Sequence, residues 1–151
     1  MLIGTELIAK GLDFPKVTLA CILDADSSLR IPSYLSDERT FDLISQFVGR
    51  AGRKDLKGRV LLQTYNPNNE VIQLGAKQDY DTFYLKEMEE RKKYKYPPHT
   101  YLSSIDIKGV DLKEVLSIAD QIKNYLLKKT AGLRFDIFGP SAPYIAHING
   151  R

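Results

Sequence analysis

An almost unbroken apolar run over residues 17–23 is the feature that most limits the fold. A strand of a parallel sheet is covered on both faces and has such a run, whereas a strand with one wet face alternates apolar and polar residues. The run ends in Asp24-Ala25-Asp26, at the carboxyl edge where open α/β sheets place their ligands. We therefore predict an α/β fold in which residues 17–23 form a central strand and Cys21 is a small buried hydrophobic residue.

Helix and strand patterns alternate after this run, as they do in α/β proteins. A helical pattern covers residues 37–53, with Ser36 or Asp37 as its N-cap. The other elements predicted in this half are a strand over 59–64 and helices over 70–77 and 79–93. Tyr96-Pro97-Pro98 then breaks the helical pattern and is the predicted domain boundary.

Beyond the two prolines, the sequence predicts a small α+β domain. Strands are expected over residues 101–107 and 134–138, and a helix over 111–129 that Asp111 caps. Apolar residues at helical spacing give this helix one apolar face: Leu112, Val115, Leu116, Ala119, Ile122 and Leu126. The chain is thus divided into residues 1–77, a connecting helix and proline boundary over 78–98, and residues 99–151.

Charge and cysteine content narrow the function classes only slightly. Lys and Arg total 22 and Asp and Glu 19, so the net charge is +3, too small an excess to indicate nucleic-acid binding by itself. No apolar run reaches the ~18 residues of a membrane-spanning helix, and the start lacks the pattern of a signal peptide. One cysteine forms no internal disulfide, so we expect a reducing, cytoplasmic setting.

The chemically informative segment lies at the end of the helix predicted over residues 37–53. At about 100° per residue, Gly49, Arg50 and Arg53 all fall within about 60° of Gln46. The opposite side of the helix is apolar and consists of Phe41, Ile44, Phe47, Val48 and Ala51. One face therefore packs, while the other presents an amide and two guanidinium groups that suit phosphate oxygens, with Gly49 allowing close approach. The alternative is a solvated amphipathic helix whose arginines bind nothing, with Gly52 as a C-cap.

A second segment, residues 4–14, also carries groups that suit a nucleotide or a phosphate. The Thr5 hydroxyl follows a predicted strand end, and Lys10-Gly11 places a charge beside flexible backbone. Asp13 could bind a ribose hydroxyl or a water near a nucleotide-bound metal. Taken singly, each has a plainer explanation, Thr5 as a helix cap and Lys10 as a surface lysine.

Taken in order, these segments form a known pattern. They are Gly4-Thr5, Ala9-Lys10-Gly11-x-Asp13-Phe14, Glu38-Arg39-Thr40-Phe41 and Gln46-x-x-Gly49-Arg50-Ala51-Gly52-Arg53. The set resembles motifs V and VI of superfamily 2 helicases. With the intervening Asp24-Ala25-Asp26 and the later Pro97-Pro98 and Gly139-Pro140 segments, it resembles the PriA family of replication-restart helicases over nearly all 151 residues.

The resemblance implies a role for each matching position. Gln46, Arg50 and Arg53 match residues that reach across a cleft to the ATP phosphates, one arginine acting as a finger on the transferred phosphate. Gly11 and Asp13 match the nucleotide-facing part of motif V, and Thr5 and Lys10 its DNA-facing part. In fold terms, the resemblance implies part of a RecA-like second helicase lobe followed by a small α+β domain.

Several motifs of such a motor are absent from the sequence. It has no Gly-x-x-x-x-Gly-Lys-[Ser/Thr] phosphate loop, no Asp-Glu-x-His magnesium motif and no Cys-x-x-Cys zinc pairs. The resemblance therefore implies a fragment, inactive alone, of a longer enzyme that uses ATP and Mg²⁺ and carries zinc elsewhere. Its implied partners are branched or single-stranded DNA, single-strand-binding protein and other primosome proteins. An open sheet edge would also permit association between copies of the fragment.

Two lesser candidates and two alternative functions remain. Residues 91–96 interleave four cations with two tyrosines, which suits either a DNA contact or a solvated helix end. His99 and His147 have no partners at metal-ligand spacing, so no metal site is expected. The alternatives to a replication-restart motor are another superfamily 2 helicase and a non-catalytic DNA- or partner-binding module.

Overall fold

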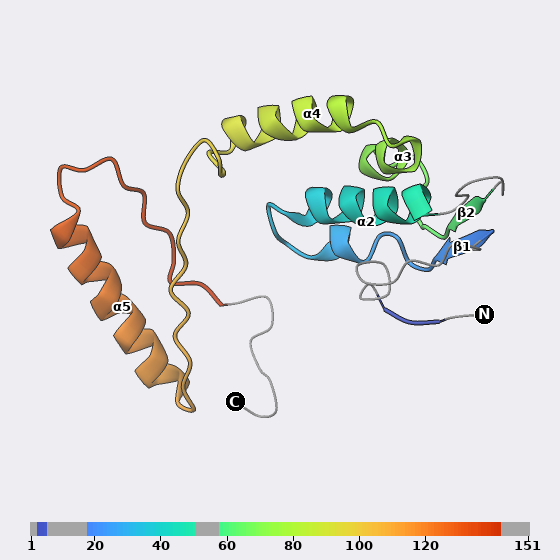
Figure 1. The fold of residues 1–151 in the computed structure, drawn as a ribbon. Coiled ribbons are helices and arrows are strands. Elements are labelled where there is room, and N and C mark those ends of the chain that lie inside the picture. The colour runs from blue at the N-terminus through green and yellow to red at the C-terminus, as the bar shows by residue number, and fades with distance from the viewer. Residues whose placement is uncertain (1–2, 6–17, 51–57, 143–151) are drawn as a thin grey trace. The chain divides into compact units, whose positions relative to one another are not determined.

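The computed structural model describes residues 3–5, 18–50 and 58–142 (Figure 1). Contacts between residues divide the chain into two units, Met1–Leu102 and Ser103–Arg151, each of which is described by itself. The described residues of the first unit form two strands, a short 3₁₀ helix over Ser28–Arg30 and three α-helices, and those of the second form one α-helix. None of the described helices is long and apolar enough to cross a membrane.

The two strands of the first unit, β1 (Leu19–Ile22) and β2 (Arg59–Leu62), pair in parallel. Leu19 lies opposite Arg59, and Ile22 opposite Leu62. Parallel neighbours need a crossover connection, and the segment between these strands includes helix α2 (Ser36–Arg50). The expectation of an α/β fold with a parallel sheet is confirmed for this pair of strands.

The expectation that β1 is covered on both faces is wrong for the described residues. Leu19 is 54% exposed, Leu61 is 57% exposed and Cys21 is exposed, whereas Ile22 is buried. Among the described elements, α2 contacts both strands, and its side chains bury only one face of them. An apolar run shows that a strand can be buried on both faces. Which faces are actually buried depends on the elements that pack against the sheet.

Helix α2 packs on the sheet with its apolar side, and its first turn is closed by a hydrogen bond within the helix. Ile44 is fully buried with Ile22, Ala25 and Ile72, and Phe47 and Val48 pack against this core. At the start of the helix, the buried Thr40 hydroxyl donates to the Ser36 carbonyl at 2.8 Å. Of the five residues that the 3.6-residue period assigns to packing, Phe41 and Ile44 are buried and Phe47 and Val48 pack against the core, while Ala51 lies outside the described residues.

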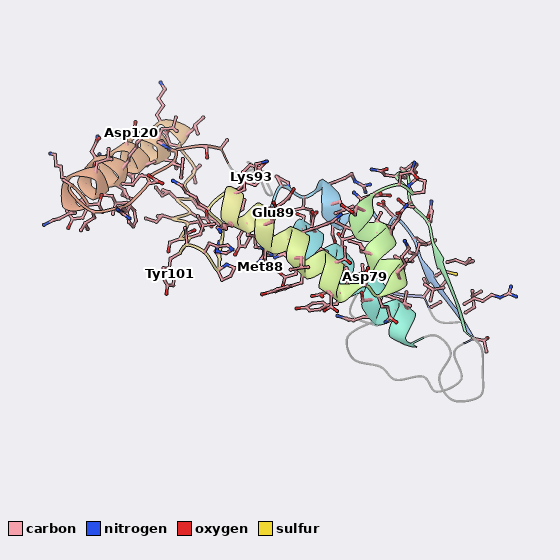
Figure 2. All side chains as sticks on the ribbon, turned by 90° about the horizontal axis from the view of Figure 1, so that it is seen from above. Asp79, Met88, Glu89, Lys93, Tyr101 and Asp120 are labelled. Atoms are coloured by element: carbon pink, nitrogen blue, oxygen red, sulfur yellow. The ribbon has the colours of Figure 1, made fainter. Side chains whose placement is uncertain are left out.

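Helices α3 (Glu70–Lys77) and α4 (Tyr80–Lys93) begin and end as the sequence predicts, within one residue. Their starts are set by local caps: the side chains of Asn69 and Asp79 accept hydrogen bonds from the backbone N–H groups of Ile72 and Thr82, both at 3.2 Å. Figure 2 shows Asp79 and Lys93 at the two ends of α4. A second buried cluster joins the helices: Phe41, Leu74 and Phe83, with the Phe41 and Phe83 rings stacked at 4.2 Å.

Gly75 lets α3 approach α2 closely. A Cβ added at Gly75 would lie 3.1 Å from Cβ of Ile44 and 3.2 Å from its Cγ2, and Ile44 is fully buried. Because a fully buried side chain has little room to shift, we expect Gly75→Ala to lower the free energy of unfolding by about 1–3 kcal/mol. Urea denaturation measures this loss, and an unchanged midpoint would show that the helices move apart freely.

In the second unit, α5 (Leu112–Lys129) confirms the predicted helix and its cap, since the Asp111 side chain accepts from the Lys113 N–H at 2.8 Å. None of its residues is fully buried; from the predicted apolar face, the least exposed are Val115, Ala119, Ile122 and Leu126. Residues 101–107 and 134–138 are not strands, so the predicted α+β arrangement is wrong for residues 103–142. A strand needs a paired neighbour, and alternation in sequence does not supply one.

Candidate nucleotide site on helix α2

The outer side of α2 carries the described part of the candidate site. Gln46 is half-buried and Gly49, one turn later, is exposed, while Ile44 on the opposite side is fully buried. Arg50 is the last residue of the helix, and its side chain lies outside the described residues. The predicted separation of a packed and a polar side is therefore confirmed from Phe41 to Gly49.

Gly49 has no packing reason to be glycine among the described residues. A Cβ there would meet one atom within 4 Å, Nε2 of Gln78 at 3.3 Å, which is the end of an exposed side chain. Glycine inside a helix costs about 1 kcal/mol relative to alanine. Gly75 differs, because buried atoms of the neighbouring helix occupy the space beside it. A glycine at position 49 would be explained if a ligand or a segment outside the described residues approached the helix backbone closely there.

The remaining predicted site residues are not placed. Arg53 lies in 51–57 and Lys10, Gly11 and Asp13 in 6–17, outside the described residues. Thr5 is described and exposed. Of the eight predicted residues, the structure therefore brings Gln46, Gly49 and the backbone of Arg50 together on one helix and leaves their relation to the others open.

The carboxyl edge of the sheet is held by hydrogen bonds within the protein. Asp26 is buried, and its carboxylate accepts from the Thr64 hydroxyl at 2.7 Å and the Tyr65 N–H at 2.8 Å. Asp24 has a left-handed backbone (φ 56°) and pairs with Arg30. The Thr64 hydrogen bond lowers the pKa of Asp26 more than burial raises it. These two carboxylates therefore tie β1 to the residues around it.

Asp26→Asn should lower the free energy of unfolding at neutral pH by about 1–2 kcal/mol, because the charged acceptor of two hydrogen bonds is lost. The pKa of Asp26 is lower in the folded chain than its ordinary value of 3.8. Its contribution is therefore complete above that value and disappears as the pH falls through the folded pKa. Urea titrations at pH 7 and at decreasing acidic pH should show the two proteins converging. Asp106→Asn, in an exposed segment of the second unit, serves as the control and should change neither curve.

Arg91 is a structural residue that the sequence pattern assigned to a basic surface. Its side chain is 12% exposed; Nη2 donates to Oε2 of Glu38 at 2.6 Å and Nε to Oε1 of Glu87 at 2.8 Å. Its guanidinium carbon also lies 5.5 Å from the centroid of the Tyr34 ring. The Glu87–Arg91 spacing of four residues is visible in the sequence, but Glu38 is 53 residues away. Of the cations in the candidate DNA contact over residues 91–96, only the exposed lysines after Arg91 therefore remain candidates.

No metal cluster is evident where side chains are described: residues 3–5, 18–50 (except the Arg50 side chain) and 58–142 hold no group of three or more His, Cys, Asp or Glu side chains suited to a metal ion. Of the two histidines, His99 has its Nε2 3.2 Å from the Met88 carbonyl oxygen. His147 lies outside the described residues.

No protein-family model matches the chain. Curated proteins that resemble it are bacterial replication restart proteins, which is the class that the ordered motifs indicate. The particular protein is PriA in each case: the chain is 44% identical to that of Bacillus subtilis over all 151 residues, 34% to that of Thermotoga maritima over 150, and 36% to that of Rickettsia typhi over 151.

The resemblance to PriA is confirmed along the whole chain. The matched segments make up 19% of the Bacillus subtilis and Thermotoga maritima proteins and 23% of the Rickettsia typhi protein. The chain therefore spans about a fifth of the length of the curated relatives that it matches.

Proposed function

We propose that this chain is part of a longer replication-restart motor and supplies one side of its ATP site. In this proposal Gln46 and Arg50 of α2, together with Arg53 three residues further along the chain, contact the ATP phosphates, and Gly11 and Asp13 contact the nucleotide. Thr5 and Lys10 contact the DNA backbone. Residues outside this chain hold most of the nucleotide and its Mg²⁺, in a RecA-like arrangement of two lobes.

The observation that carries the proposal is the exposed glycine on the polar side of a firmly packed helix. The opposite side of α2 is anchored by Ile44 in one buried cluster and by Phe41 in another. A helix held in this way cannot rotate to relieve a misplaced side chain, so the side of the helix on which Gln46 and Gly49 lie is fixed by the fold. Gly49 between them leaves room for a ligand's phosphate and exposes the backbone to it.

The chemistry proposed for these residues is electrostatic. Phosphoryl transfer is catalysed largely by positioning and by neutralising charge on the equatorial oxygens of the transferred group. A guanidinium group presents a planar set of N–H donors that matches two phosphate oxygens at once. Arg50 or Arg53 would supply that set, and the Gln46 amide would orient a phosphate oxygen or the attacking water.

The longer protein is proposed to unwind branched DNA in the 3′-to-5′ direction and to assist loading of the replication machinery in the bacterial cytoplasm. Single-strand-binding protein and other primosome proteins are its proposed partners, and zinc is proposed to bind outside this chain. The resemblance to PriA supports these assignments. The chain alone is expected to hydrolyse no ATP, because its sequence lacks a phosphate loop, so tests of activity use the longer protein.

Gly49→Ala tests the proposal because its structural and functional effects should have opposite signs. In the 151-residue chain, the free energy of unfolding should stay unchanged or rise by up to about 1 kcal/mol, as alanine favours the helix. In the longer protein, kcat/KM for ATP should fall about tenfold, because the new methyl group occupies the space proposed for a phosphate.

Gly75→Ala is the matched control, with reduced stability in the chain and an unchanged KM for ATP in the longer protein. Unchanged ATP turnover by Gly49→Ala would contradict the proposal and would favour a DNA- or partner-binding module.

A further inference from the structure

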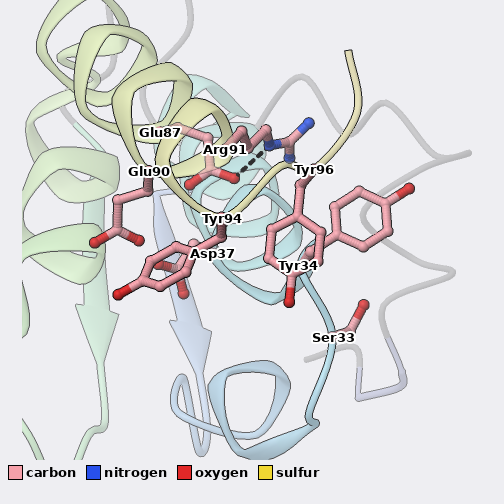
Figure 3. A pocket seen from close by; sticks show the side chains of 8 residues that line it. All are labelled: Ser33, Tyr34, Asp37, Glu87, Glu90, Arg91, Tyr94 and Tyr96. Atoms are coloured by element: carbon pink, nitrogen blue, oxygen red, sulfur yellow. Dashed lines mark hydrogen bonds and ion pairs between the residues drawn. The ribbon is translucent and has the colours of Figure 1, made fainter. Parts of the chain in front are cut away.

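A small pocket in the first unit lies between the beginning of α2 and the end of α4. Its volume is about 120 Å³. A water molecule's share of the liquid is about 30 Å³, so the pocket has room for the end of a side chain. The residues that line it are mostly acidic or aromatic: Ser33, Tyr34, Asp37, Glu87, Glu90, Arg91, Tyr94 and Tyr96 (Figure 3).

Two carboxylates of this pocket lack a cation. The side-chain carboxylates of Asp37 and Glu90 form no ion pair or hydrogen bond with any residue that the structure describes. Burial raises the pKa of Asp37, and the charge of Glu90 raises it further, so the two groups repel each other. Arg91 does not relieve them, because its guanidinium group is already paired with Glu87 and Glu38.

The position of Glu90 adds to this cost. Asp37 lies in the first turn of α2, where the helix dipole favours an anion. Glu90 lies near the end of α4, which finishes at Lys93, where the dipole favours a cation instead. The fold therefore holds two mutually repelling carboxylates together, one of them at an unfavourable helix end.

The aromatic residues of the pocket favour the same kind of ligand. The Tyr34 and Tyr96 rings stack on each other (Figure 3), with centroids 5.2 Å apart, and the centroid of the Tyr94 ring lies 6.5 Å from that of Tyr96. Two of the rings already have a cation over them, Arg91 over Tyr34 at 5.5 Å and Lys93 over Tyr94 at 5.1 Å. Ring faces attract cations, and cages that combine rings with carboxylates recognise substituted ammonium groups.

We propose that this pocket binds one protonated amine or guanidinium group. The group is either an arginine or lysine side chain of another protein segment, or the end of a free polyamine. Its charge would lie between Asp37 and Glu90, and its carbon atoms would pack against the tyrosine rings. A phosphate or carboxylate would be repelled by the same carboxylates, so this site is separate from the proposed ATP contacts on the other end of α2.

The test follows tyrosine ring resonances of the 151-residue chain by NMR. The probes are N-acetylarginine amide, spermidine and N-acetylcitrulline amide, a neutral analogue of nearly the same shape as the first. At least one cation should shift the resonances saturably, and the citrulline compound should not. Saturation by the arginine compound identifies a protein side chain as the source, whereas saturation by spermidine alone identifies a free polyamine.

Two variants on adjacent positions of α4 make the test specific. Glu90→Gln should weaken binding about tenfold, the loss expected from removing one charge-assisted contact. It should also raise the urea midpoint of the unliganded chain, because the repulsion with Asp37 is removed. Glu89→Gln removes the same charge one residue away on α4 (Figure 2), at a position that does not line the pocket, and should change neither binding nor the urea midpoint. Absence of any cation-dependent shift, equal binding of the citrulline compound, or equal weakening by both variants would overturn the proposal.

Discussion

Arg50→Ala in the longer protein is expected to lower the rate of ATP hydrolysis by about a thousandfold, the lower end of the effect of arginine fingers in other phosphoryl-transfer enzymes. The reason is that the guanidinium group neutralises charge that develops on the transferred phosphate, and alanine leaves that charge uncompensated. The loss should appear in kcat, because the interaction is stronger in the transition state than in the bound substrate. Rapid-mixing single-turnover assays with saturating DNA measure it directly.

Arg39→Ala is the matched control for this experiment. Arg39 is an exposed arginine on the same polar side of α2, about three turns before Arg50, so its removal changes the charge of the helix equally. We expect its effect on kcat to be less than threefold, and Arg53→Ala to resemble Arg50→Ala if both guanidinium groups reach the phosphates. DNA binding with full ATP turnover in both Arg50→Ala and Arg53→Ala would contradict the motor assignment of this helix.

Arg91→Ala is expected to lower the free energy of unfolding of the 151-residue chain by about 2–3 kcal/mol. Breaking a fully buried ion pair costs about 3–5 kcal/mol. Glu38 is 45% exposed and remains partly hydrated, which reduces the loss, but Glu87 is only 13% exposed. Burial already raises the pKa of Glu87 although Arg91 acts against it, so removal of Arg91 leaves a poorly solvated carboxylate.

Lys92→Ala provides the comparison for Arg91→Ala in urea denaturation. Lys92 is the next residue of α4, is exposed and should alter the free energy of unfolding by no more than about 0.5 kcal/mol. Arg91→Lys should recover part of the loss, because an ammonium group cannot hold two carboxylates with the geometry of a guanidinium group. Equal stabilities of the Arg91→Ala and Lys92→Ala chains would mean that the two ion pairs contribute nothing.

Elements whose ends depend on neighbouring residues could be predicted well. Asn69, Asp79 and Asp111 each accept a hydrogen bond from a backbone N–H two or three residues ahead. The first residues of α3, α4 and α5 therefore depend only on nearby residues in the sequence. The buried side of α2 was equally predictable, because a 3.6-residue period places apolar side chains together without reference to the rest of the chain.

Features that depend on distant residues could not be predicted. The alternation over residues 101–107 finds no strand partner in the part of the chain that the structure describes, and the apolar character of β1 does not reveal that no described helix covers Cys21 and Leu19. Arg91 and Lys92 are adjacent cations in the sequence. In the structure Arg91 pairs with Glu38 of α2, whereas Lys92 is exposed, and the sequence alone does not distinguish the two.

The sequence by itself determined the helices, their caps, the positions of the two strands and the resemblance to PriA, because these depend on residue types at short and fixed spacings. Only the tertiary structure decided that Gly75 is required by packing while Gly49 is not, that Asp26 and Arg91 are structural, and that Asp37 and Glu90 line one pocket without forming an ion pair with its arginine. These properties depend on contacts between residues that are far apart in the sequence. A local sequence pattern carries no information on which distant residues come into contact.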